Sequence, residues 1–242
     1  MNPLKRVLRR TRLLDDPFED AVALAVSRTR DPVVLDVGCG NHSPAKFKEQ
    51  FPGVRYVGID IAEYNLDDAD RSAADELIIL DCPPEQFTDR LAEAIVGRRF
   101  DAIILRHVVE HCVEPARTVS VLATALSRPG TFYLTFPCEA SVNFPHGRNS
   151  TLNFYDDPTH RWVPVVSELE AGLPAGCEVT KLVLRARGGA LVGAVCWLVA
   201  MPGLTFARLT GRAVRVSGVT WRALGFETVM VVSNLVDAGE RR

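Results

Sequence analysis

The chain has 242 residues, of which 47% are hydrophobic and 24% charged, and its formal net charge at pH 7 is −2. This composition is typical of a globular protein and allows one α/β domain with additions. The near-neutral charge argues against nucleic acid as a partner. The six cysteines form no Cys-x-x-Cys pair and no apolar leader is visible, so we expect reduced thiols and a cytoplasmic protein.

The N-terminal region, residues 1–29, is expected to contain two helices. Basic and apolar side chains share residues 1–13 with helical spacing, which indicates an amphipathic helix that is either solvated or lies on an anionic membrane. Asp15, Asp16 and Pro17 are typical of a helix start. A second helix is therefore expected from about Phe18 to Arg28.

The apolar run from Val33 to Val37 contains a single polar residue, Asp36, and ends at Gly38-Cys39-Gly40. Such a run predicts a strand buried on both faces of a parallel sheet. The two glycines allow a tight turn and leave no Cβ between the backbone and a ligand. A helix is expected from about Pro44, so the loop joins a strand to a helix N-terminus. Nucleotide-like ligands bind in that crevice of open α/β sheets.

A second strand, Arg55 to Ile59, ends in Asp60, whose carboxylate is placed to accept hydrogen bonds from both hydroxyls of a ribose. The dinucleotide motif Gly-x-Gly-x-x-Gly would require a third glycine where Ser43 stands. A nicotinamide-dependent oxidoreductase is therefore the less favoured interpretation.

The order Asp-x-Gly-x-Gly followed by a strand ending in aspartate resembles class I S-adenosylmethionine-dependent methyltransferases, over roughly residues 30–140. The resemblance implies a Rossmann-like α/β fold and S-adenosyl-L-methionine as cofactor. It also implies a set of cofactor-binding residues: Asp36, Gly38, Cys39, Gly40, Asp60, Ile61, Asp81, Cys82 and Arg106. The apolar run from Leu77 to Cys82 is expected to be a third short, buried strand. In this family Asp81, near its end, would approach the adenine amino group. The alternative is that Asp81 caps a helix before Pro83.

A helix is expected from Phe87 to Val96 and a fourth strand from Phe100 to Leu105. The strand is followed directly by Arg106-His107-Val108-Val109-Glu110-His111. His-x-x-Glu-His also occurs in zinc peptidases, but there it lies inside a long helix. In the resembled family this segment borders both cofactor and acceptor.

Three roles remain open for the segment 107–111. His107 or His111 would act as a general base, for which imidazole is suited. Alternatively, Glu110 and His111 only position the loop. Some related O-methyltransferases hold a metal with Glu-x-x-Glu-His. This chain has His107 at the first position, yet His107, Glu110, His111 and His160 could still form a metal site. We assign the catalytic role to His107 and His111 and expect no metal.

A helix from Ala116 to Leu126 and a fifth strand from Thr131 to Pro137 are expected next. Residues 138–164 are polar, aromatic and rich in turns, and a loop this long is usually functional. Asp-Asp-Pro-Thr-His resembles an acceptor-side segment of bacterial methyltransferases of glycan and envelope biosynthesis. The resemblance implies that Tyr155, Asp157 and His160 bind the acceptor. The alternative is an Asx-type turn between Asp157 and Thr159.

A short helix from Val166 to Gly172 and two more strands, at 177–186 and 226–234, complete the expected elements. Residues 188–207 carry no charge and are flanked by arginines. A bilayer-spanning helix is rejected, because it would separate two strands of one sheet. The segment 188–222 is either a helical insertion packed on the domain or a lid in peripheral contact with lipid.

The predicted fold is one α/β domain over residues 30–242, with a seven-stranded, mostly parallel sheet, helices on both faces and a hydrophobic helical insertion before the last strand. The predicted function is S-adenosylmethionine-dependent methyl transfer to a small-molecule, glycan- or lipid-linked acceptor, at a hydroxyl. A cytoplasmic location is expected, with contact at the inner face of the membrane as an open alternative. A catalytically silent, methyltransferase-like binding subunit is the main alternative function.

Overall fold

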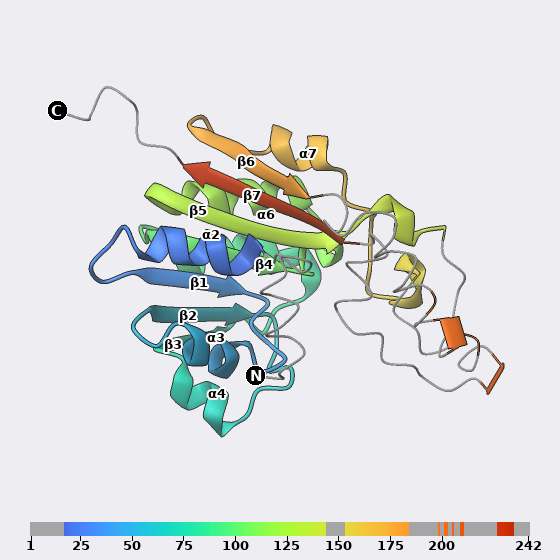
Figure 1. Ribbon diagram of the computed structural model, residues 1–242, viewed down its shortest axis with the longest axis horizontal. Coiled ribbons are helices and arrows are strands. Elements are labelled where there is room, and N and C mark those ends of the chain that lie inside the picture. The colour runs from blue at the N-terminus through green and yellow to red at the C-terminus, as the bar shows by residue number, and fades with distance from the viewer. Residues whose placement is uncertain are drawn as a thin grey trace.

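The structure is a computed structural model that describes residues 17–143, 153–183 and 227–234, together with six single residues between 198 and 210. The predicted helix within residues 1–13 lies outside the described residues. So do most of the insertion at 188–222 and residues 144–152 of the long loop. Element labels follow Figure 1.

A seven-stranded sheet with the order β3-β2-β1-β4-β5-β7-β6 forms the centre of the molecule (Figure 1). The strands are β1 (Val33–Val37), β2 (Arg55–Asp60), β3 (Glu76–Ile79), β4 (Phe100–Arg106), β5 (Leu126–Pro137), β6 (Cys177–Val183) and β7 (Glu227–Asn234). Strands β1 to β5 pair in parallel, whereas β7 is antiparallel to both β5 and β6. The predicted mostly parallel sheet with an antiparallel last strand is confirmed.

The strand order reverses between β1 and β4. From β1 the chain moves outward through β2 to β3, then returns to place β4 on the other side of β1. The carboxyl ends of β1 and β4 therefore border the crevice that such a reversal creates in parallel sheets. The loop at residues 38–40 and the segment 107–111 lie at these two strand ends, so the fold brings the two sequence motifs together.

Helices cover both faces of the sheet, as predicted (Figure 1). They are α2 (Pro17–Val26), α3 (Ser43–Gln50), α4 (Asp68–Ala73), α5 (Phe87–Ile95), α6 (Pro115–Thr124) and α7 (Val166–Ala171). Four short 3-10 helices join them: η1 (Pro84–Gln86), η2 (Val109–His111), η3 (Glu139–Ser141) and η4 (Phe154–Asp156). Among the described residues, none of the helices has the length and apolar character needed to cross a bilayer.

Two hydrophobic cores hold these layers together because the strands are apolar on both faces. One core joins α5, α6 and α7 to the sheet and contains Leu91, Leu122 and Leu169. The other joins α2 and α3 to the opposite face and contains Phe18 and Phe47. Burial of this apolar surface is the main stabilising contribution and makes the strand ends a rigid base for the loops.

Two strand predictions were wrong in detail. The run from Leu77 to Cys82 was expected to be a buried strand, but β3 ends at Ile79 and its residues are only half-buried. The reason is that β3 lies at the edge of the sheet, where one neighbour is missing. Strand β5 begins at Leu126, and its pairing with β4 shifts register between Phe100 and Ala102. Apolar composition alone does not reveal sheet order or a register shift.

A cavity of about 550 Å³ lies at the edge of the sheet where β6 begins and β7 ends, lined by Arg128, Cys177 and Asn234 among others. The parallel strands β1, β2 and β4 begin on this side of the sheet, so their carboxyl ends lie on the opposite side. None of the predicted site residues lines this cavity. The candidate site therefore lies away from this cavity, at the carboxyl ends of the parallel strands.

Candidate functional site

The Gly38-Cys39-Gly40 loop leaves β1 and crosses the end of β2. The backbone N–H groups of Gly38 and Cys39 both donate to the carbonyl of Ile59, at 2.8 and 3.3 Å. Gly38 has a φ of +78°, and a Cβ placed there would lie 2.3 Å from Cγ2 of Val108. Only glycine satisfies both conditions without strain. The loop consequently packs directly against the segment that follows β4.

Asp60 ties the ends of β1 and β2 together. Its Oδ2 accepts a hydrogen bond from the backbone N–H of Gly40 at 2.9 Å, and its Oδ1 accepts one from Ile61 at 2.7 Å. A carboxylate oxygen has two lone pairs, so Oδ2 can accept a further bond, whereas Oδ1 also accepts a longer bond of 3.4 Å from the N–H of Ala62. The half-buried Asp60 carboxylate thus lies beside the glycine loop with an open acceptor position on Oδ2 for a hydroxyl group.

Asp36 and Cys39 support this loop from inside the fold. Asp36 is 2% exposed, and the Tyr56 hydroxyl donates to its Oδ2 at 2.7 Å. Burial raises the pKa of Asp36, although Arg106 and the Tyr56 hydrogen bond oppose the shift. Burial also raises the pKa of the fully buried Cys39 thiol. Of these two predicted cofactor residues, Cys39 can reach a ligand in the loop only through its backbone.

The other predicted cofactor residues lie around the same strand ends. Asp81 is exposed just after β3, has a φ of +42° and donates its N–H to the carbonyl of Ile61 at 3.1 Å. Cys82 is half-buried, and burial raises the pKa of its thiol. Arg106 places its guanidinium over the ring of Phe18, 4.7 Å from the ring centroid. Its side chain is therefore drawn toward α2.

His107 holds two carboxylates at the end of β4. Its Nδ1 lies 3.3 Å from Oε1 of Glu110, and its Nε2 lies 3.2 Å from Oε1 of Glu227. Desolvation opposes protonation of the ring, but the hydrogen bonds to both glutamates outweigh it and raise the pKa of His107 to about 9. At neutral pH His107 is an imidazolium that bridges η2 and the first residue of β7. A protonated imidazole has no lone pair for accepting a proton.

Glu110 is completely buried and has an unused acceptor. Its Oε1 faces His107, and the same oxygen is 4.0 Å from Nε2 of His160. Its Oε2 is buried and has no hydrogen-bond partner among the residues that the structure describes. Leaving a carboxylate oxygen buried and unpaired is costly, so such an atom usually faces a water, a ligand or an ion. The Oε2 atom is the strongest single indication of a ligand in this part of the molecule.

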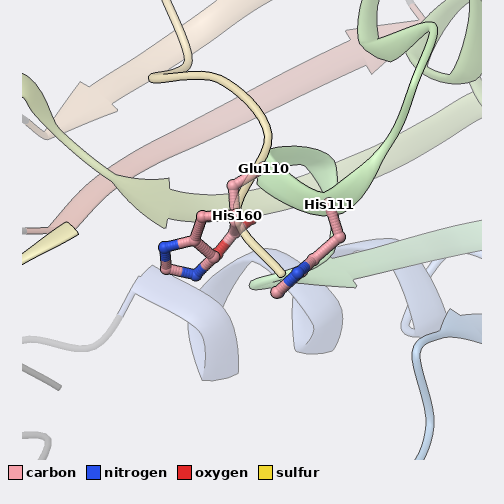
Figure 2. A group of neighbouring side chains, drawn as sticks. All are labelled: Glu110, His111 and His160. Carbon is pink, nitrogen blue, oxygen red and sulfur yellow. The ribbon is translucent and has the colours of Figure 1, made fainter. Parts of the chain in front are cut away.

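His111 and His160 complete the cluster. Figure 2 shows Glu110 and His111 projecting from η2 and His160 from the segment after η4 into the same space. The His111 and His160 rings are 4.8 Å apart between centroids. The Nδ1 of His111 is 2.9 Å from the Thr159 hydroxyl, and the Nδ1 of His160 is 2.6 Å from the carbonyl of Phe154. Each ring is thus held by a partner on its Nδ1 side.

The segment 153–162 is fastened to η2 by its backbone as well as by side chains. The N–H of Arg161 donates to the carbonyl of Glu110 at 2.9 Å, and the indole N–H of Trp162 donates to Val109 at 3.1 Å. These bonds hold two segments some fifty positions apart in the chain in one arrangement. The segments that carry the predicted catalytic and acceptor residues therefore lie side by side.

Two of the predicted acceptor residues have different surroundings. Oδ1 of Asp157 accepts hydrogen bonds from the N–H and the hydroxyl of Thr159, at 2.8 and 2.6 Å. This is the Asx-type turn considered as the alternative, and Oδ2 of Asp157 lies 4.0 Å from Nε2 of His160. Tyr155 is 58% exposed, on the outer side of η4.

Two residues of the site were not predicted. Glu227 is 7% exposed at the start of β7, and Thr159 bonds His111. Because β7 is antiparallel, its first residue lies at the edge where the parallel strands end. A lone glutamate that opens an apolar strand is a weak signal for such a position. Thr159 stood inside the recognised Asp-Pro-Thr-His segment, but only the fold shows its contact.

The residues present could hold a cation. One ligand atom from each of Glu110, His111 and His160 lies within 4.8 Å of the others, and two imidazoles with one carboxylate suit a transition metal. A second cluster, His42, Asp67 and Asp70, also meets this distance. Its buried member, Asp70, already accepts bonds from Ala45 and Asp67 and pairs with His42. The unpartnered Oε2 of Glu110 distinguishes the first cluster from the second.

Comparisons with known proteins bear on the family and the fold of this chain. Residues 8–172 match the family model described as a methyltransferase domain, which is more than half of the chain. A protein of Parvibaculum lavamentivorans named ubiquinone biosynthesis O-methyltransferase is 28% identical over 166 residues, which cover 66% of this chain and 64% of the relative. A protein of the same name from Methylobacterium nodulans is 26% identical, covering 57% of this chain and 55% of the relative. The chain thus matches less than two thirds of either relative's length.

Among solved structures, the plantazolicin methyltransferase BamL, in complex with a desmethylPZN analog and SAH, superposes with a TM-score of 0.54. It is 17% identical, and the superposition covers 87% of this chain and 79% of BamL. At 17% identity this structural similarity supports the fold alone.

Proposed function

This chain belongs to the family of methyltransferase domains, and we propose that it transfers the methyl group of S-adenosyl-L-methionine to a hydroxyl of a small-molecule acceptor. One observation carries the proposal. The glycine loop and the Asp60 carboxylate lie together at the ends of β1 and β2, and the loop packs on Val108 in the histidine-bearing segment. A cofactor crevice and a polar acceptor site are therefore neighbours.

In the proposed complex Asp60 accepts hydrogen bonds from the ribose hydroxyls, and Asp81 accepts one from the adenine amine. Gly38 and Gly40 let the backbone approach the methionine part of the cofactor. S-Adenosylmethionine supplies a methyl group already activated by a sulfonium. What remains for the chain is to hold the acceptor oxygen in line, exclude water and remove the hydroxyl proton.

We assign proton removal to His111. His107 and His111 were both predicted as catalytic, but His107 has a pKa of about 9 and is already protonated at neutral pH. It is better suited to holding Glu110 and Glu227 in place. His111 has its Nδ1 engaged by Thr159, which leaves Nε2 for the acceptor hydroxyl. The names of the two curated relatives, which specify O-methyl transfer, support a hydroxyl acceptor.

A divalent cation bound by Glu110, His111 and His160 is the second candidate. The unpartnered, fully buried Oε2 of Glu110 favours it, as does the convergence of three ligand atoms within 4.8 Å. A cation there would polarise an acceptor oxygen and lower its pKa. The Glu-x-x-Glu-His pattern of metal-binding O-methyltransferases begins with an acidic residue. This chain has His107 there, so Glu110 would be the one carboxylate among the three ligands.

Calorimetry on chelator-stripped protein separates the two candidates. If Glu110, His111 and His160 form a cation site, wild type should bind Zn²⁺ or Mn²⁺ and Glu110→Gln should not. The control His42→Gln, which alters the other cluster, should bind these ions as wild type does. If Glu110→Gln binds these ions as tightly as wild type, the cation reading is wrong and His111 acts as a base alone.

The acceptor is proposed to be glycan- or lipid-linked, with Tyr155, Asp157 and His160 shaping its pocket within the acceptor loop 138–164. We further propose that residues 30–242 form one methyltransferase domain, preceded by N-terminal helices and carrying the apolar insertion 188–222. Leu198, Met201 and Leu209, described residues of that insertion, are 73%, 37% and 81% exposed. Exposed apolar side chains of this kind support peripheral contact with a membrane or a lipid acceptor at its cytoplasmic face.

Methyl transfer can be measured without knowing the acceptor. Methyl-labelled S-adenosylmethionine is incubated with the protein and with lipid and polar extracts in separate reactions. We expect label in a lipid or glycan fraction and a rate about 10²- to 10⁴-fold lower for His111→Gln, the range of general-base catalysis. Arg99→Gln, an exposed change distant from the strand ends, serves as the control and should keep the wild-type rate. Cofactor binding without label in either extract would favour the silent-subunit alternative.

A further inference from the structure

Thr159 has a single hydroxyl hydrogen and two neighbours that compete for it. Its Oγ1 is 2.6 Å from Oδ1 of Asp157 and 2.9 Å from Nδ1 of His111. A carboxylate oxygen only accepts, so the hydroxyl must donate to Asp157. The lone pairs of Oγ1 then face His111, and Nδ1 of His111 must be the donor. The hydrogen positions follow from the network as a whole.

The surroundings of Asp157 favour its ionised form, which can only accept hydrogen bonds. Partial burial disfavours its charged form, but the hydrogen bonds from the hydroxyl and N–H of Thr159 prevail and lower the pKa of Asp157 below its usual value. The carboxylate is therefore ionised at neutral pH and acts only as an acceptor. The Asx-type turn fixes the Thr159 side chain relative to Asp157, so the direction of the hydroxyl is set by backbone geometry.

We propose that the Asp157–Thr159 pair holds neutral His111 in the tautomer with hydrogen on Nδ1 and the lone pair on Nε2, which makes Thr159 a positioning residue of the site. An unconstrained neutral imidazole favours the opposite tautomer, with hydrogen on Nε2. The inference rests on the proposed function for its purpose, because either proton removal or cation binding by His111 needs the Nε2 lone pair.

The neighbouring histidine supports this assignment. Nδ1 of His160 is 2.6 Å from the carbonyl of Phe154, which can only accept, so Nδ1 of His160 carries a hydrogen as well. Different partners, a threonine hydroxyl and a backbone carbonyl, thus impose the same tautomer on two rings whose centroids are 4.8 Å apart. With hydrogen on Nδ1, the neutral form of either ring has its lone pair on Nε2, and Nε2 of His160 lies 4.0 Å from Oε1 of Glu110.

The ring nitrogen signals of His111 test the proposal directly. Protein labelled with ¹⁵N in its histidine rings is studied by NMR without cofactor or metal, at a pH where His111 is neutral, and His111→Gln identifies the signals. Wild type should show a protonated Nδ1 and an unprotonated Nε2. Thr159→Val should move the hydrogen to Nε2, whereas Thr159→Ser, which keeps the hydroxyl, should retain the wild-type pattern.

A second readout separates positioning from folding. Thr159→Val should bind S-adenosylhomocysteine as wild type does and transfer methyl about 10-fold or more slowly, and Thr159→Ser should recover the rate. A wild-type His111 with hydrogen on Nε2, or a Thr159→Val variant with an unchanged pattern, would overturn the proposal. Because the spectra need neither cofactor nor turnover, this result stands even if the methyl-transfer proposal fails.

Discussion

Two histidines four positions apart show how partners decide what a side chain does. His107 lies between two glutamates, which raise its pKa to about 9, so its protonated form prevails at neutral pH. Nδ1 of His111 faces the Thr159 hydroxyl, which itself donates to Asp157, so Nε2 of His111 keeps its lone pair. Residue type predicted a general base at either position. The difference comes from Glu227 and Thr159, which the fold supplies.

Replacing the protonated His107 should lower the stability of the fold. His107→Gln removes the charge that offsets Glu110, which is fully buried, and Glu227, which is 7% exposed. Because the His107 side chain is 41% exposed, we expect a loss of about 1–3 kcal/mol, below the range for fully buried pairs. Urea unfolding at pH 7 measures this loss. The control is Arg90→Gln, which breaks an exposed ion pair and should cost less than about 0.5 kcal/mol. Equal effects of both changes would contradict the assignment.

The glycine loop offers a second test at single residues. Gly38→Ala places a Cβ 2.3 Å from Cγ2 of Val108 and forces alanine to a φ of +78°. We expect a loss of about 1–3 kcal/mol in stability together with weaker cofactor binding. Gly53→Ala is the matched control, since a Cβ at Gly53 meets nothing within 4 Å. Wild-type affinity and melting temperature in Gly38→Ala would show that the loop is not packed as described.

At the scale of elements, α4 holds the start of α3 next to the cofactor loop. Asp70 of α4 is fully buried, and its Oδ1 accepts the N–H of Ala45 in the first turn of α3. Its Oδ2 pairs with Nδ1 of His42 at 2.7 Å and accepts the N–H of Asp67 at 3.1 Å. One carboxylate therefore joins two helices that are both too short to be stable alone.

Asp70→Asn should lower stability by about 1–3 kcal/mol at neutral pH, because an amide has one acceptor oxygen where the carboxylate has two. Desolvation disfavours the charged form of Asp70, but its hydrogen bonds with Asp67, His42 and Ala45 lower its pKa below the usual value of an aspartate. A lowered acid pKa stabilises the fold above the unfolded-state pKa of about 3.9, and the stabilisation is lost as the pH falls through the folded-state pKa. In thermal unfolding experiments from pH 7 to pH 3, the difference in melting temperature between wild type and Asp70→Asn should become smaller below about pH 4. A difference that stays constant would contradict this account.

At the scale of the whole molecule, sequence reasoning placed most elements because their patterns are local. Val33–Val37 and Arg55–Asp60 are apolar runs bounded by turn residues, and each is a strand. The edge position of β3 and the register shift in β5 depend on neighbours, so composition could not reveal them. The same limit applies to the site. Glu227 bonds His107 across 120 positions of the chain, and Thr159 bonds His111 across 48.

The exposed apolar residues of the insertion give a prediction for the molecule as a whole. Replacing Leu198, Met201 and Leu209 together by serine removes apolar surface without adding charge. We expect wild type to sediment with vesicles containing anionic lipid and the triple variant to bind at least about 10-fold more weakly, since each lost side chain contributes on the order of 1 kcal/mol. Cofactor affinity should be unchanged. Equal sedimentation of the two proteins would show that these side chains do not contact lipid.

The central claim is that residues 38–40 and Asp60 form the site for S-adenosyl-L-methionine. Calorimetric titration with S-adenosylhomocysteine tests it most directly, using wild type, Asp60→Ala, and the Arg99→Gln control. We predict micromolar binding by wild type and the control, and a loss of at least about 10-fold in Asp60→Ala, because each hydrogen bond from a ribose hydroxyl to the charged carboxylate contributes about 1.5–3 kcal/mol. Absence of binding by the wild-type protein, or wild-type affinity in Asp60→Ala, would contradict the account.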